Sequence, residues 1–128
     1  MPISYEIDRS ARLIVTRCVG QTELLDVMRH LEELVSLPDC PPSLDVLLDL
    51  SEMTTIPDSS QLHAAASATA KASEHIRFDH CAIVTSSEPV RGLAMVWVMF
   101  AQRSFHATEV FRTFEEARGW LASSKVHD

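Results

Sequence analysis

Apolar residues recur along the chain with two different periods, and this predicts strands that alternate with helices. Two short apolar runs, at 3–8 and 12–20, flank a turn-like stretch and predict a β-hairpin. Over 22–37 the apolar spacing changes to three and four residues, which predicts a helix capped by Thr22 with one core-facing stripe. The stripe consists of Leu24, Val27, Met28, Leu31, Leu34 and Val35.

The rest of the chain repeats the strand-then-helix pattern three times. Strands are predicted at 44–51, 80–87 and 108–114, and helices at 59–75, 89–105 and 113–124. The run at 44–51 is almost continuously apolar, which is typical of a central strand covered on both faces. Thr113, with Glu116 three residues later, forms a capping box for the last helix.

Strands that alternate with helices indicate crossover connections and therefore a mostly parallel sheet. The N-terminal hairpin makes that sheet mixed. The predicted fold is an α/β domain with a five-stranded sheet and about four flanking helices, in the order ββαβαβαβα. We expect one domain at 1–124 and a flexible tail at 125–128.

The third predicted helix is hydrophobic on every side, since all residues from Leu93 to Ala101 are apolar. Such a helix is expected to be covered all round, and the run is too short to cross a bilayer, which takes about 20 residues. One side rests on the sheet. The other could be covered by a second copy of the chain, by the neighbouring helix, or by a small hydrophobic ligand or membrane surface.

We favour the second copy, because exposed apolar patches mark interfaces and symmetric dimers are the commonest oligomers. The dimer contact is expected within 93–105. A ligand would instead occupy a cavity near Met95 and Met99, whose flexible side chains suit adaptable packing. The residues expected at the interface or hydrophobic ligand site are Leu93, Met95, Val96, Trp97, Val98, Met99 and Phe100.

Composition narrows the function further. The 128 residues carry 11 basic and 18 acidic side chains, and the net charge of −7 disfavours a nucleic-acid partner. The three cysteines lie far apart without zinc-ligand spacing, and the three glycines form no phosphate-binding loop. No signal peptide and no transmembrane segment is evident. We therefore expect a cytoplasmic protein without a metal site or cofactor.

The segment Asp58-Ser59-Ser60 precedes the alanine-rich second helix and has two interpretations. Ser and Asp are common helix caps, and we favour this role. A phosphate on Ser59 would also be tolerated at the positive end of the helix dipole, and it would repel an acidic partner. His63 lies one turn after Ser59, but without a nucleophile-elbow motif an exposed helix histidine is the favoured interpretation.

The chain resembles the SpoIIAA-like branch of the STAS superfamily, the anti-sigma-factor antagonists and their relatives, which are related to the CRAL-TRIO lipid-transfer fold. The resemblance rests on "YEID", "RLIVTRCVG", "VLLDLSEMTTI", "HCAIVTSSEPVRGLAMVW" and "VFRTFEEARGWL", in that order over nearly the whole chain. In the last of these, the residues that carry it are Phe111, Phe114, Ala117, Trp120 and Leu121.

The resemblance implies a non-enzymatic protein-interaction or regulatory module. In the antagonists the helix after the central strand begins Asp-Ser-Ser-Gly-Leu, and a kinase phosphorylates the first serine. The matching residues here are Asp58, Ser59, Ser60 and Leu62. Gln61 replaces the glycine, and Pro57 lengthens the preceding interval by one residue. We thus expect a homodimeric module with a candidate switch at Ser59, an unknown protein partner and no catalytic residue; the alternative is a carrier of a small hydrophobic or lipid-like ligand.

Overall fold

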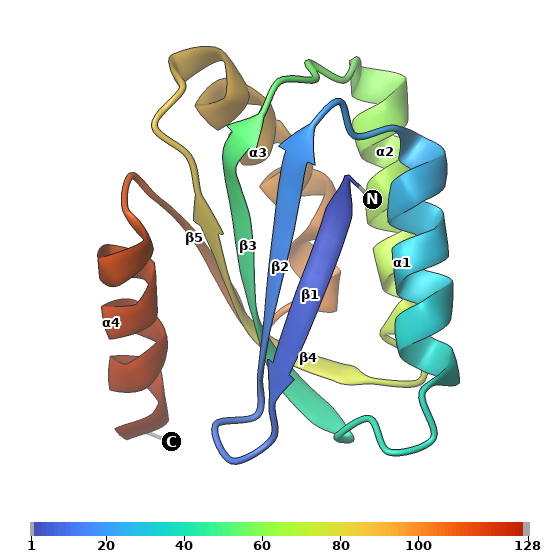
Figure 1. Ribbon diagram of the computed structural model, residues 1–128, viewed down its shortest axis with the longest axis vertical. Helices are drawn as coiled ribbons and strands as arrows, with labels where there is room; N and C mark the ends of the chain where they lie inside the picture. The colour runs from blue at the N-terminus through green and yellow to red at the C-terminus, as the bar shows by residue number, and fades with distance from the viewer. Residues whose placement is uncertain (1, 127–128) are drawn as a thin grey trace.

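The computed structural model describes residues 2–126 and forms one five-stranded sheet with helices on both faces (Figure 1). The strands are β1 (Ile3–Asp8), β2 (Leu13–Gly20), β3 (Ser43–Met53), β4 (Arg77–Val84) and β5 (Ala107–Phe111). They lie in the sheet in chain order; β1 is antiparallel to β2, and every later pair is parallel.

Three helices cover one face of the sheet, and the last helix covers part of the other (Figure 1). They are α1 (Leu24–Ser36), α2 (Ser59–Ala72), α3 (Glu88–Ala101), which continues into a short 3-10 turn (Gln102–Ser104), and α4 (Phe114–Val126). Right-handed crossovers that step along the sheet in one direction place their helices on one face, so α1, α2 and α3 form one layer. The predicted order and mixed, mostly parallel sheet are confirmed.

Several predicted helix ends differ from those observed: α2 ends at Ala72 rather than at 75, and α3 ends at Ala101 rather than at 105. Glu23, not Thr22, caps α1, and the Glu23 backbone N–H donates to the Asp26 carboxylate at 2.9 Å. Thr22 is buried, and its own backbone N–H donates to Thr55 Oγ1 in the loop before α2. At the C-terminus α4 extends to Val126, and the remaining part of the expected tail, 127–128, lies outside the described residues.

Hydrophobic cores lie on both faces of the central strands. On the α4 side, the buried residues are Leu13, Leu47, Ala82, Val84, Ala117 and Leu121. On the side of α1–α3 they include Ile14, Leu34, Leu44, Phe78, Cys81, Ile83 and Ala94. Leu44 and Leu47 of β3 are both 0% exposed. This strand is therefore covered on both faces, in accordance with its continuous apolar sequence.

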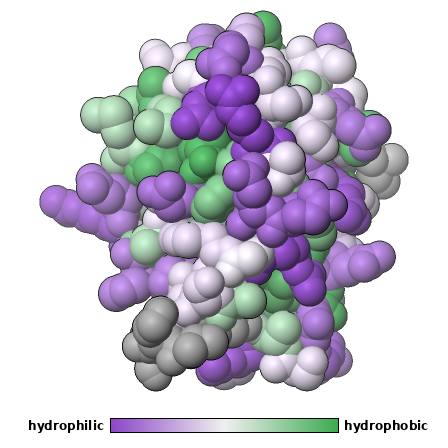
Figure 2. All heavy atoms as spheres, turned by 90° about the vertical axis from the view of Figure 1, so that its left-hand side faces the viewer, coloured by the Kyte–Doolittle hydropathy of each residue, from purple (hydrophilic) through white to green (hydrophobic). Residues whose placement is uncertain are grey.

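The side of the molecule that carries α4 is mostly hydrophilic. Figure 2 shows this side, where hydrophobic atoms gather mainly in the upper left part among polar ones. At the edge of the sheet β1 alternates half-buried and exposed residues, and its exposed positions are Ser4, Glu6 and Asp8.

Candidate functional site

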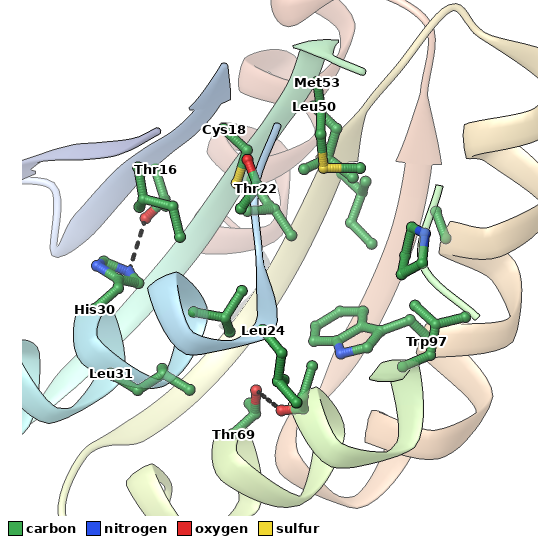
Figure 3. Close-up of a pocket in the computed structure, with 18 of the residues that line it drawn as sticks. Thr16, Cys18, Thr22, Leu24, His30, Leu31, Leu50, Met53, Thr69 and Trp97 are labelled. Atoms are coloured by element: carbon green, nitrogen blue, oxygen red, sulfur yellow. Dashed lines mark hydrogen bonds between the residues drawn. The ribbon is translucent and has the colours of Figure 1, made fainter. Parts of the chain in front are cut away.

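A cavity of about 190 Å³ lies between the sheet and the layer of α1, α2 and α3. Side chains from the sheet and from all three helices line it, and nearly all of them present carbon to the space (Figure 3). The lining residues include Ile14 and Leu48 from the sheet, Leu24 from α1, Leu62 from α2, and Leu93 and Trp97 from α3. The site is thus an apolar cavity on the side of the sheet that carries α1, α2 and α3.

The small side chains of α2 explain why space remains there. Its cavity-facing residues run from Leu62 through Ala65 to Thr69, so no large side chain projects from the middle of the helix. Protein interiors are normally as dense as organic crystals, and voids much larger than a water molecule are few. A void of this size between the sheet and α2 is therefore a distinctive feature of the molecule.

A few polar groups interrupt the apolar walls. Thr69 Oγ1 donates to the Ala65 carbonyl at 2.9 Å and is satisfied within its own helix. Thr16 Oγ1 and His30 Nε2 lie 3.5 Å apart, at the limit of a hydrogen bond. Among the described residues, Thr22 Oγ1 has no partner at normal hydrogen-bond geometry, although the Cys18 thiol lies near enough for a weak contact.

Burial favours the neutral forms of two titratable groups of the cavity, His30 and Cys18. Burial lowers the pKa of His30, against a smaller opposing effect of the Glu33 carboxylate. Burial and the Asp49 carboxylate raise the pKa of the Cys18 thiol to about 11, so the thiolate form is disfavoured at neutral pH. Glu23, at the start of α1, is the one charged residue that lines the cavity in the described part of the chain, and it is exposed. This chemistry suits binding of an uncharged molecule.

The lowered pKa of His30 predicts acid sensitivity. The unfolded chain takes up a proton on this imidazole near pH 6.5, whereas folded His30 resists it, so stability falls as the pH drops below about 6.5. His30→Gln removes this contribution. Urea denaturation at pH 7 and pH 5 should show a larger acid loss for the wild type than for the variant; equal losses would contradict a buried, neutral His30.

The Asp58-Ser59-Ser60 segment forms the N-terminus of α2, as the sequence predicts. Asp58 is the cap: its carboxylate accepts from the Gln61 backbone N–H at 2.8 Å and from Ser60 Oγ at 2.9 Å. The Gln61 side chain accepts from the Asp58 backbone N–H at 2.9 Å and completes a capping box. Ser59 is exposed beside this cap. His63 is also exposed, and its ring contacts Phe100 edge-on at 5.1 Å between centroids.

Removal of this cap should destabilise the domain without unfolding it. Asp58→Ala leaves the first amides of α2 without their acceptor, and we expect the melting temperature to fall by a few degrees. Ser60→Ala removes only a donor to the same carboxylate and serves as the control. The melting temperatures of the wild type and of both variants are measured by circular dichroism during heating. An unchanged melting temperature in Asp58→Ala would mean that the cap contributes little.

The apolar residues of α3 divide into three groups rather than two faces. Ala94 and Val98 pack on the sheet against Cys81 and Ile83. Leu93 and Trp97 line the cavity. The residues left exposed are Met95 at 51%, Met99 at 73% and Phe100 at 44%, whereas Val96 is half-buried. The described part of the chain thus leaves the outer side of this helix uncovered.

The cavity lies elsewhere than the sequence suggests. Leu93 and Trp97 do line it, but Met95 and Met99 are not among its lining residues in the described chain. The contributions of α1 and of the first strands, such as Thr16 and His30, were missed by sequence reasoning. The alanines of α2 are the sequence signal that could have indicated the cavity, since small residues on a helix that faces the sheet leave space between the two.

Comparisons with known proteins place the chain in a family. A SpoIIAA-like family model matches residues 13–122. A search of curated proteins found no match. Among solved structures, the chain is similar to an uncharacterized protein of the DUF3478 family with a SpoIIAA-like fold, from Shewanella loihica PV-4. The two share 18% identity with a TM-score of 0.62, over 93% of this chain and 91% of that one. The chain belongs to the SpoIIAA-like family.

Proposed function

We propose that the protein is a non-enzymatic binding module that holds a small apolar molecule between its sheet and helices α1, α2 and α3. The SpoIIAA-like fold suggests a STAS-type regulatory or interaction module, and a bound ligand is one way for such a module to receive a signal. The cavity of about 190 Å³ is the observation that carries the proposal.

The energetics favour an occupant. The apolar walls are only partly shielded by the described residues, and an apolar ligand that covers them gains about 25 cal/mol for each Å² removed from water. Apolar walls hold water poorly, and an engineered cavity of roughly 150 Å³ binds benzene. A single ring with one or two further heavy atoms matches the space here.

Toluene is a suitable first probe. A ligand that binds only the folded chain raises its stability by about 2.7 kcal/mol at a hundred times its dissociation constant. We expect the melting temperature to rise saturably with toluene, and native mass spectrometry of freshly purified protein to show a co-purified small molecule. No shift up to the solubility limit of toluene, together with the mass of the bare chain, would contradict the proposal.

A second proposed function is self-association through the outer side of α3. The exposed Met95, Met99 and Phe100 form an apolar strip on one helix, and such strips commonly mark interfaces. In sedimentation experiments we expect the wild type to be a dimer and Met99→Lys to be a monomer. Met28→Lys, at an exposed position on α1, is the control and should remain dimeric. Dimer formation rises with protein concentration, so a wild type that is still monomeric at about 100 µM rules out this interface.

Phosphorylation of Ser59 is a further proposal for regulation. Ser59 is exposed, whereas the Ser60 hydroxyl is bonded to Asp58. A phosphate at Ser59 would add about two negative charges beside the Asp58 carboxylate. Ser59→Asp should keep the fold and lose a protein partner that both the wild type and Ser59→Ala capture. Equal capture by all three chains would argue against the switch.

A further inference from the structure

One end of the cavity carries a polar pair that the domain leaves incompletely bonded. Thr16, on β2, is 3% exposed and lines the cavity. Its hydroxyl oxygen lies 3.5 Å from His30 Nε2, which is longer than an ordinary hydrogen bond. Figure 3 shows Thr16 and His30 on one side of the space and Trp97 on the opposite side. The cavity therefore has a polar end and an aromatic end.

The hydrogen-bonding capacity of this pair exceeds what the chain supplies. A threonine hydroxyl offers one donor and two acceptor sites, and a neutral imidazole offers one donor and one acceptor. The only bond joining the two side chains in the described structure is the long one between Thr16 Oγ1 and His30 Nε2. Polar groups that lack hydrogen bonds are unfavourable away from water. A ligand that bonds to this pair therefore binds more tightly than one that does not.

The charge pattern limits the polar group that can bind. The lining residues include no lysine or arginine in the described chain, and their one carboxylate, Glu23, is exposed at the start of α1. Burial lowers the pKa of His30, so this side chain supplies no positive charge at neutral pH. An anionic group in the cavity would be buried without a counter-ion, which is far more costly than burial of a neutral hydroxyl. A carboxylate or phosphate at this end is therefore disfavoured.

The opposite end suits an aromatic ring. Trp97 and Phe105 both line the cavity, with ring centroids 5.9 Å apart and a tilt of 59°. Aromatic rings attract one another in tilted and edge-to-face arrangements beyond their simple burial. A ligand ring beside Trp97 can join this arrangement.

We propose that the ligand is a small uncharged aromatic alcohol, with its ring toward Trp97 and its hydroxyl bonded to Thr16 and His30. This inference rests on the proposed binding function and specifies the class of molecule. A hydroxyl group both donates and accepts, so it complements the pair whichever imidazole nitrogen carries the proton.

Three probes of similar size test the inference: p-cresol, toluene and 4-methylbenzoate. Affinities are measured by calorimetry on the full chain at pH 7.5, for the wild type, Thr16→Val and Thr69→Val. Thr69 is the matched control, because it is also a buried cavity threonine but its hydroxyl is bonded to Ala65. We expect the wild type to bind p-cresol about three- to tenfold more tightly than toluene, the gain typical of one net hydrogen bond.

Thr16→Val should abolish that preference, Thr69→Val should retain it, and 4-methylbenzoate should not bind. If the wild type binds p-cresol and toluene with equal affinity, Thr16 and His30 do not bond the ligand hydroxyl, although the cavity still binds an apolar molecule. Binding of neither compound overturns the proposed function itself. Binding of 4-methylbenzoate as tight as p-cresol overturns the uncharged class. If Thr16→Val fails to fold by circular dichroism, His30→Phe provides the same comparison, and a preference retained there contradicts the inference.

Discussion

Leu47→Ala is expected to lower the free energy of unfolding by about 2 to 5 kcal/mol, the range for large-to-small substitutions in well-packed cores. Leu47 is 0% exposed in the middle of β3, in the cluster that joins the sheet to Ala117 and Leu121 of α4. Truncation of the Leu47 side chain creates a cavity, and the backbone of a central strand covered on both faces cannot move to close it. Urea denaturation measures the change directly.

Leu25→Ala provides the control for that experiment, because Leu25 on α1 is 56% exposed. Surface substitutions of this kind usually change stability by less than about 0.5 kcal/mol. A loss for Leu47→Ala no larger than that for Leu25→Ala would mean that α4 does not pack on the sheet as described.

Ala65→Phe is expected to reduce toluene affinity more than about tenfold, an effect above about 1.4 kcal/mol in binding free energy. Ala65 faces the cavity from the middle of α2, so a phenyl group there occupies the space that the ligand needs. Because the new side chain fills a void, the free energy of unfolding should be maintained or increased. Calorimetric titration and urea denaturation of the same sample give both values.

Ala70→Phe places the same side chain on the exposed side of α2 and should bind toluene as the wild type does. If Ala65→Phe also binds toluene with wild-type affinity, the ligand does not occupy the cavity between the sheet and α2. If both variants lose binding, the effect comes from the helix rather than from the cavity.

The sequence allows the order of elements to be predicted because local signals determine it. The apolar run of β3 and the Asp58 cap of α2 appear in the structure as expected. The predicted start of α1 was wrong: Glu23 is the cap, and Thr22 instead donates its backbone N–H to Thr55 Oγ1, a residue distant in sequence. No local pattern reports such a contact.

The cavity was only partly predictable, for a similar reason. The apolar run of α3 predicts that Trp97 lies at an interface or a ligand site, but the rotation of the helix about its axis cannot be deduced from an all-apolar segment. Ala94, a small residue, lies against Cys81 and Ile83 of the sheet and fixes this rotation. As a result Trp97 turns toward the cavity, whereas Met95 and Met99 turn to the surface. Residues 2–126 do not supply the full cover that the sequence predicts for α3.

The position of a bound probe shows whether the ligand occupies the cavity between the sheet and helices α1, α2 and α3. Methyl resonances of the leucines and methionines can be followed by NMR while toluene is added to the full chain. We expect saturable shifts at Leu24, Leu62 and Leu93, which line the cavity, and none at Leu13 or Leu121 on the α4 side. Shifts confined to the outer side of α3 at Met95 and Met99, or no saturable shift at all, would contradict binding in this cavity.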